Sequence, residues 1–414
     1  MFVTAVAFPA RYVAPAGAPI GASDVARWLP ALLTAREPAG LLRDALRARF
    51  GSGHYFLSST GRAGMTLLFR AMRRLAPPAR HEVVLPSYTC YSVAASAAKA
   101  GLKVRIIDID PDTLDYALAD LAATDFSRVL AIVATNLYGL PGNLPALASL
   151  ARDRGVFLID DAAQAMGATV GGRPSGTWGD AGLFSFDKGK NVCAIDGGVL
   201  TTQSDDLAAA LHQEMAALPR PRAWASAVHV AKALGYAVLL RPSLYGFVTR
   251  IPQLELGKTV FTTEFPLDGP DPALSSLAAA MLPRLEAFTA ARRANAAALL
   301  SGLAAVSTVH PITPAVGATP VYLRLPVLCA SEAARQQTVA ALNAAGIGAS
   351  GSYPASLVDV PEVQHLMAGG PVTAEVGRHV ARCIVTLPTH PLVTSADVAR
   401  TIDIVSAVVQ PAAR

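Results

Sequence analysis

The chain has 414 residues, of which 52% are hydrophobic and 16% are charged, and it carries a formal net charge of +5. This length predicts two domains rather than one small core. The basic residues are scattered and are not interleaved with aromatic residues, which argues against a nucleic-acid-binding protein. The mean hydropathy of +0.39 is high, but alanine accounts for much of it. An alanine-rich cytoplasmic α/β protein is therefore favoured over a membrane-surface protein.

The cysteines lie far apart and form neither a CxxC pair nor a Cys/His pattern typical of zinc. We therefore expect neither a disulfide framework nor a metal site, as is typical of a protein in a reducing cytoplasm. The N-terminal residues lack a basic stretch, and prolines interrupt their apolar run, so they do not resemble a signal peptide. The four cysteines are Cys90, Cys193, Cys329 and Cys383.

Residues 1–50 form an N-terminal segment, in which residues 26–50 read as one helix before the break at residues 51–53. From there to residue 217, short apolar runs alternate with helical patterns. Strands are predicted at residues 83–85, 104–107, 129–133, 156–159 and 199–201, and helices at 61–75, 92–100 and 144–153. This alternation predicts a large α/β domain over residues 51–217, with a mostly parallel sheet, helices on both faces and ligands at the carboxyl ends of the strands.

Residues 218–271 break this pattern and are interpreted as an insertion. Its apolar run, residues 231–240, is too short to span a bilayer and includes or adjoins His229, Lys232 and Arg241. A buried or interface helix is favoured, and the alternative is peripheral membrane contact through residues 224–251.

Residues 272–414 are predicted to hold a linking helix and a smaller C-terminal α+β domain. Apolar residues at three- and four-residue spacing predict one long helix over residues 273–305. A strand at 322–325, a helix at 333–345 and a terminal helix from Ser395 are predicted to follow it.

One predicted strand ends in two acids, Asp160 and Asp161, so at least one carboxylate should lie at the carboxyl edge of the sheet. Lys190 follows in a loop between two later apolar runs. Pyridoxal phosphate (PLP) chemistry requires a lysine that binds the cofactor and a carboxylate that keeps its pyridine nitrogen protonated. Taken singly, these residues are ordinary helix caps and solvated charges, but their order favours a PLP site.

Small residues precede the helix predicted at 61–75. Backbone N–H groups near Gly61, Arg62 and Ala63 would lie at the positive end of the helix dipole, which suits a phosphate group. Ordinary helix capping is the alternative explanation for the same residues.

Several ordered motifs make the chain similar to the DegT/DnrJ/StrS-type sugar aminotransferases, a branch of the fold-type I PLP enzymes. The resemblance implies a mostly parallel, seven-stranded-type sheet in the large domain, a smaller C-terminal α+β domain, and a homodimer whose active sites form between subunits. The motifs lie at residues 85–89, 107–114, 136–141, 161–165, 179–180, 184–186, 190–191, 353–354 and 387–390.

The resemblance implies a role for each matching residue. Lys190 matches the Schiff-base lysine, which also moves a proton at the substrate carbon, and its spacing from Ser185 favours it over Lys188. Asp161 matches the partner of the pyridine nitrogen, and Gln164 matches the donor to the phenolic oxygen of the ring. Ser185 matches a phosphate ligand.

Three positions depart from the family pattern. Where relatives place an aromatic residue over the cofactor ring, this chain has Cys90, so Cys90, Tyr91 and Tyr88 all remain candidates for that place. Residues 264–267 replace a segment that, in many members, reaches the phosphate of a neighbouring subunit. Asn136 stands where relatives often have histidine.

The resemblance implies amino transfer from an amino acid, with glutamate expected, to a keto-sugar nucleotide in polysaccharide or secondary-metabolite sugar biosynthesis. A family branch that performs PLP-dependent dehydration has another residue at the position of Lys190, so this lysine argues for transamination. Two alternatives stay open. One is the same chemistry on a non-nucleotide keto substrate, such as a cyclitol or a lipid-linked glycan precursor, and the other is a non-catalytic, PLP-binding regulatory relative.

Overall fold

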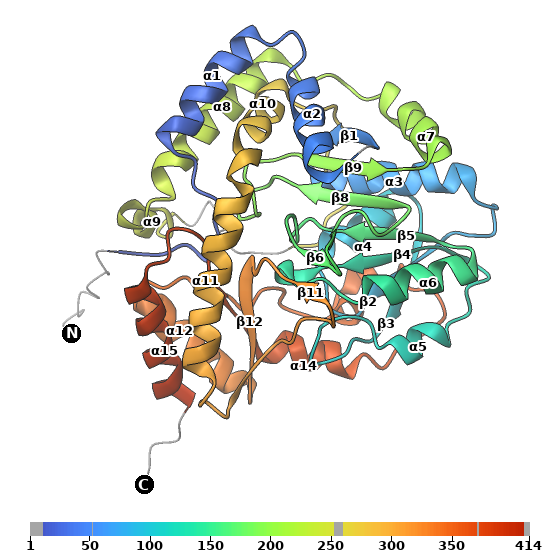
Figure 1. Ribbon diagram of the computed structural model, residues 1–414. Helices are drawn as coiled ribbons and strands as arrows, with labels where there is room; N and C mark the ends of the chain where they lie inside the picture. The colour runs from blue at the N-terminus through green and yellow to red at the C-terminus, as the bar shows by residue number, and fades with distance from the viewer. Residues whose placement is uncertain (1–10, 52, 252–259, 371, 410–414) are drawn as a thin grey trace.

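A seven-stranded sheet forms the centre of the computed structural model, which describes residues 11–51, 53–251, 260–370 and 372–409 (Figure 1). Only β9 runs antiparallel to its neighbours, and the remaining neighbouring pairs are parallel. The predicted mostly parallel sheet is therefore confirmed. In spatial order its strands are β1 (His54–Ser58), β9 (Gly198–Thr202), β8 (Ala181–Ser185), β5 (Phe157–Asp161), β4 (Val129–Thr135), β2 (Glu82–Pro86) and β3 (Lys103–Ile107).

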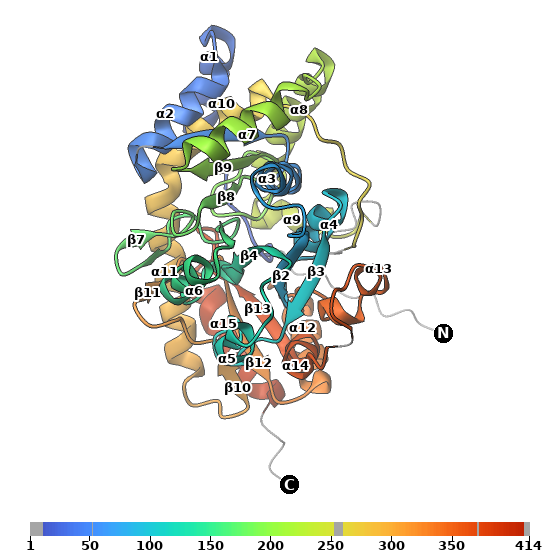
Figure 2. The ribbon, with the colours of Figure 1, turned by 90° about the vertical axis from the view of Figure 1, so that its right-hand side faces the viewer.

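The central strands are buried on both faces, which explains why they read as continuous apolar runs. In β2, Val83 and Leu85 pack into the core on one face, and Val84 packs into the core on the other. Figure 2 shows the sheet with helices on both sides, as predicted. One face carries α3 (Gly61–Leu75), α4 (Tyr91–Lys99) and α7 (Asp205–Ala216), and the other carries α5 (Leu118–Ala122) and α6 (Leu144–Arg154).

The single helix predicted over residues 26–50 is wrong, because the chain forms two helices there, α1 (Ala22–Thr34) and α2 (Pro38–Phe50). Pro38 lies in the first turn of α2, where its missing N–H group costs nothing. It also disfavours helical backbone at Glu37, whose φ is −138°. The break allows both helices to pack against α10 (Pro272–Met281), where buried Trp28 donates from Nε1 to Ala273 O at 3.0 Å.

The long helix predicted over residues 273–305 is also interrupted. It is divided into α10, the 3-10 turn η3 (Leu282–Arg284) and α11 (Leu285–Leu303), and Pro283 lies inside the break. Asp271 caps α10 by accepting from the N–H groups of Ala273 and Leu274 at 2.9 and 3.2 Å. The first half of α11 packs beside the large sheet, and its second half packs against the small one.

A three-stranded antiparallel sheet forms the C-terminal core, with β10 (Val309–Pro311), β12 (Arg324–Cys329) and β13 (Ile384–Pro388). The strand predicted at 322–325 begins only at Arg324, because Tyr322 has a φ of 50° and is not extended. The predicted helices at 333–345 and from Ser395 are confirmed as α12 (Glu332–Ala344) and α15 (Ser395–Val409). The division of the chain into residues 1–50, 51–217, 218–271 and 272–414 stays a prediction.

Short elements complete the described chain. A third small sheet joins β11 (Ala318–Thr319), β6 (Thr169–Val170) and β7 (Arg173–Pro174). The others are η1 (Leu137–Gly139), η4 (Leu357–Asp359), α13 (Pro361–Gln364) and α14 (Glu375–Cys383).

The predicted insertion contains α8 (Ala223–Leu239) and α9 (Pro242–Val248). Ala233 is the only buried residue of α8, so the interpretation of residues 231–240 as a helix buried within this chain is wrong. In the described residues, no single helix is both long and apolar enough to cross a bilayer. Only α8 and α9 taken together reach that length and composition, and they are bent by 117° relative to each other.

Candidate active site

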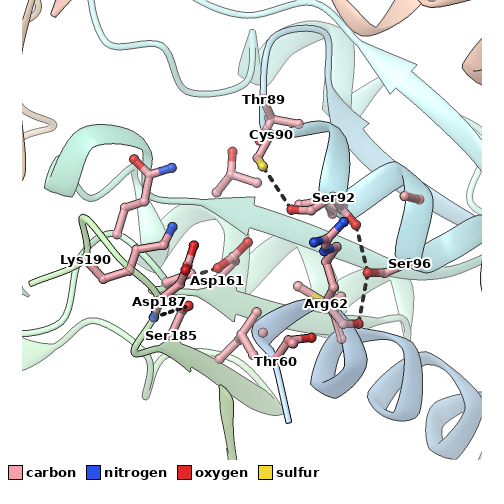
Figure 3. Close-up of a pocket in the computed structure, with 18 of the residues that line it drawn as sticks. Thr60, Arg62, Thr89, Cys90, Ser92, Ser96, Asp161, Ser185, Asp187 and Lys190 are labelled. Atoms are coloured by element: carbon pink, nitrogen blue, oxygen red, sulfur yellow. Dashed lines mark hydrogen bonds between the residues drawn. The ribbon is translucent and has the colours of Figure 1, made fainter. Parts of the chain in front are cut away.

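A cavity of about 450 Å³ opens at the carboxyl ends of β4, β5 and β8, beside the first turns of α3 and α4. Its volume lies in the range of pockets for small-molecule ligands. Figure 3 shows Lys190, Asp161 and Ser185 across the cavity from Arg62 and Cys90. The predicted site residues that line the cavity are Gly61, Arg62, Cys90, Asp161, Gln164, Ser185 and Lys190.

The two adjacent acids at the end of β5 lie in different surroundings, because successive side chains of a strand point to opposite faces. Asp160 is fully buried and accepts hydrogen bonds from Asn136 Nδ2 at 2.8 Å and from the N–H groups of Gly176 and Trp178 at 2.6 and 3.1 Å. Burial raises the pKa of Asp160 to about 6 against these hydrogen bonds. Asp160 therefore stabilises the fold, and Asp161 is the acid that lines the cavity.

Asp161 and Lys190 interact electrostatically inside the cavity. Burial raises the pKa of Asp161, whereas the N–H group of Ala163, at 3.0 Å from Oδ1, and the charge of Lys190 lower it. Lys188 also lines the cavity, but its charge lowers the pKa of Asp196 instead. Both lysines line the cavity, and the charge of Lys190, rather than that of Lys188, lowers the pKa of the carboxylate predicted to bind the pyridine nitrogen.

Gln164 is held in one orientation by two hydrogen bonds. Its Oε1 accepts from the N–H group of Tyr138, and its Nε2 donates to Tyr353 Oη, both at 2.9 Å. An amide nitrogen carries two protons, so one proton remains for an acceptor in the cavity. This arrangement is compatible with the predicted hydrogen bond to the phenolic oxygen of the cofactor.

The first turn of α3 provides fewer free N–H groups than predicted. Thr60 caps the helix, and its Oγ1 accepts from the N–H group of Ala63 at 3.0 Å. The N–H groups of Gly61 and Arg62 belong to the helix start, where no intrahelical acceptor exists. Ser185 Oγ lies 3.4 Å from the place that a Cβ on Gly61 would occupy. The predicted phosphate site is therefore limited to Gly61, Arg62 and Ser185.

Tyr88, Tyr91 and Cys90, the candidates for the residue that covers the cofactor ring, lie in different surroundings. Tyr88 is fully buried and its Oη lies 3.3 Å from Tyr138 Oη, whereas Tyr91 Oη donates to Ala355 O at 3.0 Å. Of Tyr88, Tyr91 and Cys90, only Cys90 lines the cavity. A thiol, with no aromatic ring to stack, therefore borders the cavity at this point.

Among the polar residues of the cavity wall that the sequence did not assign to the site are Thr89, Asp187 and Asp196. Burial and the charge of Asp187 raise the pKa of Asp196 to about 6, against the N–H group of Gly197 and the charges of Lys188 and Arg62. The sequence feature that could have identified Asp196 is its place directly before the paired glycines that lead into β9.

The insertion reaches the same cavity through Val260 and Thr262. Thr263 O accepts from Lys99 Nζ at 3.0 Å, and the ring of Phe265 lies 5.3 Å from the Arg62 guanidinium and 4.8 Å from Lys99 Nζ. Residues 260–265 therefore contact α3 and α4 of their own chain.

The donor set of the cavity fits the predicted PLP. A lysine, a carboxylate, an amide donor and a serine hydroxyl line the cavity together with the N-terminal residues of α3. Thr89 Oγ1 is buried in the wall and has no hydrogen-bond partner among the described residues. A polar ligand in the cavity would satisfy this hydroxyl group.

Replacement of Asn136 tests how its hydrogen bond to Asp160 stabilises the protein. Because the pKa of Asp160 is raised from 3.8 to about 6 in the folded state, ionisation of this carboxyl group costs stability as the pH rises from about 4 to above 6. Asn136→Ala removes a donor to the ionised form, and we expect a loss of about 2 kcal/mol in unfolding free energy at pH 8 and a smaller loss at pH 5. Urea unfolding at both values measures this difference.

The matched control is Asn143→Ala, since Asn143 caps α6 by accepting from the N–H group of Ala146 at 3.2 Å. We expect this variant to lose about 1 kcal/mol equally at both pH values. An equal loss at pH 5 and pH 8 for Asn136→Ala would contradict the role assigned to its bond with Asp160.

Comparisons with known proteins agree with this geometry. The sequence model of the DegT/DnrJ/EryC1/StrS aminotransferase family matches residues 41–238 and 271–406. The chain is 26% identical over 341 residues to a UDP-N-acetyl-3-dehydro-alpha-D-glucosamine 3-aminotransferase of Acidithiobacillus ferrooxidans, covering 82% of this chain and 80% of the relative. It is 36% identical over 146 residues to a GDP-perosamine synthase of Caulobacter vibrioides, covering 35% and 39%. The crystal structure of the aminotransferase TlmJ from Streptoalloteichus hindustanus superposes with a TM-score of 0.77 at 24% identity, covering 96% of this chain and 98% of that one.

Proposed function

Because the chain belongs to the DegT/DnrJ/EryC1/StrS aminotransferase family, we propose that it transfers an amino group from glutamate to a keto-sugar nucleotide. The protein is a PLP-dependent aminotransferase with the fold-type I architecture. The observation that supports the proposal most directly is that Lys190 and Asp161, at the end of β5, line one cavity together with Gln164 and Ser185.

Each residue of the cavity would have a distinct role in this reaction. Bound PLP supplies an electron-accepting ring conjugated to the substrate nitrogen. Asp161 would hold the proton on the pyridine nitrogen, and Gln164 would orient the ring through its remaining amide proton. The N–H groups of Gly61 and Arg62, with Ser185 Oγ, would bind the phosphate.

Lys190 would act twice. Its Nζ would hold the cofactor, which is why the residue must be a lysine. As a free amine it would take a proton from the substrate carbon, as a general base, and would return a proton when the acceptor is aminated.

The acceptor is proposed from the relatives. The Acidithiobacillus protein is named for amino transfer to a 3-dehydro sugar attached to UDP, and the Caulobacter protein is named a GDP-perosamine synthase. In this chain, Arg62 and Lys188 contribute positive charge to the cavity wall, as a diphosphate requires. A non-nucleotide keto substrate is the second candidate, since the insertion at Val260 and Thr262 lines the cavity.

We also propose that the enzyme works as a homodimer in the cytoplasm. The family resemblance supports the dimer, and four free thiols among the described residues are in keeping with a reducing compartment. Light scattering after size-exclusion chromatography tests the dimer, and a monomeric, fully active enzyme would contradict it.

Mass spectrometry of the products tests the proposed acceptor. The purified enzyme with PLP and glutamate is incubated with a panel of keto-sugar nucleotides, the corresponding free keto sugars and a keto cyclitol. We expect an aminated product from at least one nucleotide and none from the free sugars. Conversion of glutamate without amination of any nucleotide would retain the aminotransferase and reject this acceptor class.

A further inference from the structure

The outer face of α8 is apolar. A surface helix normally turns its apolar stripe towards the core and its charges towards water. α8 departs from this arrangement because its outer side is apolar as well: Ala233 alone is buried, and Trp224 is 65% exposed. The exposed residues of α8 are Ala223, Trp224, Ala227, Val228, Ala231, Lys232, Leu234, Val238 and Leu239, of which only Lys232 is charged.

The next helix continues this surface. In α9, Phe247 is 62% exposed, and the Arg250 guanidinium lies 5.5 Å from the centre of its ring. Ile251, directly beyond α9, is 46% exposed. Figure 1 shows α8 at the edge of the molecule, with α9 at its C-terminal end; there, Tyr12 joins Pro242 at the start of α9 to Asn343 of α12. Contiguous exposed apolar surface of this kind marks an interaction site.

The charged residues within the segment that carries this apolar face have one sign. Residues 215–254 contain no aspartate or glutamate. Five basic residues lie in the same stretch, and all are exposed: Arg220, Arg222, Lys232, Arg241 and Arg250. The partner must therefore combine apolar material with negative charge.

A second copy of this face does not meet that requirement. A two-fold contact brings the same patch of both subunits together, so it would place the five basic residues of one copy near the five of the other. Nucleic acid supplies the negative charge but no apolar layer. An anionic bilayer supplies both, because its lipid tails accept apolar side chains and its headgroups attract lysine and arginine.

We propose that α8 and α9 bind peripherally to an anionic membrane surface. Trp224 and Phe247 enter the boundary between headgroups and tails, and Arg222, Arg241 and Arg250 contact lipid phosphates. The bend of 117° between the helices allows both to lie in the plane of the membrane rather than across it. Binding does not depend on the proposed acceptor, so the two proposals can fail separately.

Vesicle flotation tests the proposal. The full-length PLP-loaded enzyme is mixed with phosphatidylcholine vesicles, with or without phosphatidylglycerol. We expect flotation with the anionic vesicles only, and weaker flotation at high salt. For Arg222→Glu/Arg241→Glu we expect the partition coefficient to fall at least roughly thirtyfold, since each basic residue near an anionic surface contributes about a factor of five. Trp224→Ser/Val238→Ser should also lower it.

The matched control is Val316→Ser/Arg382→Glu, which changes one exposed apolar and one exposed basic residue in other parts of the chain. It should float like the wild type, and all variants should keep the wild-type circular dichroism spectrum and aminotransferase activity in solution. Three results would overturn the proposal: no flotation of the wild type, equal binding to neutral vesicles, or conversion of a dimer into monomers by Trp224→Ser/Val238→Ser. The last result would identify the face as a subunit interface.

Discussion

Replacement of Lys190 by alanine is expected to lower turnover by roughly a thousandfold or more, and to abolish the visible absorbance of the lysine-bound cofactor. The alanine can neither bind PLP covalently nor move a proton at the substrate carbon. In the structure, Lys190 lines the cavity and its charge lowers the pKa of Asp161. Absorbance spectra and steady-state kinetics with glutamate measure both effects.

Lys188→Ala is the matched control, because Lys188 lies two residues away and lines the same cavity. We expect this variant to keep the absorbance band, since its charge acts on Asp196 rather than on Asp161. If Lys188→Ala lost the band and Lys190→Ala kept it, the cofactor lysine would be Lys188.

Asp161→Asn is expected to lower turnover by roughly a hundredfold or more while PLP stays bound to Lys190. An amide cannot hold a proton on the pyridine nitrogen as a carboxylate does, so the ring accepts electrons less well. Burial makes this effect large, because no water replaces the missing charge. Turnover and cofactor absorbance, measured on the same sample, separate a loss of catalysis from a loss of cofactor.

Asp187→Asn provides the comparison, because Asp187 is another acid of the cavity wall. Asp187 is not the acid at the end of β5, and its charge raises the pKa of Asp196; we expect less than a tenfold change in turnover. A larger loss for Asp187→Asn than for Asp161→Asn would reject Asp161 as the partner of the pyridine nitrogen.

Much of the large sheet was predictable, because its strands are buried on both faces. A doubly buried strand reads as an apolar run whatever its neighbours are, and β2 to β5 all fall where the sequence predicted them. The helices were less predictable at prolines. Pro38 and Pro283 each divide a pattern that reads as continuous, because apolar spacing does not reveal where the axis of a helix changes direction.

The site was predictable to the level of residue types and their order. Asp161, Gln164, Ser185 and Lys190 do meet at one cavity. The hydrogen bonds of the polar atoms around the site were not predicted. The N–H group of Ala63, predicted to bind the phosphate, donates instead to Thr60 Oγ1, which caps the helix. Burial, which depends on the packed chain, raises the pKa of Asp196.

The sequence by itself determined the cofactor chemistry and the α/β class, because both depend on local order: a strand that ends in acids, a lysine in the following loop, and apolar runs of strand length. Only the tertiary structure showed that Asp160 is buried and bound to Asn136, whereas Asp161 faces the cavity that Lys190 lines. It also decided that α8 turns its apolar face outward. These outcomes depend on which surfaces become buried together, and burial is a property of the packed chain that no local pattern contains.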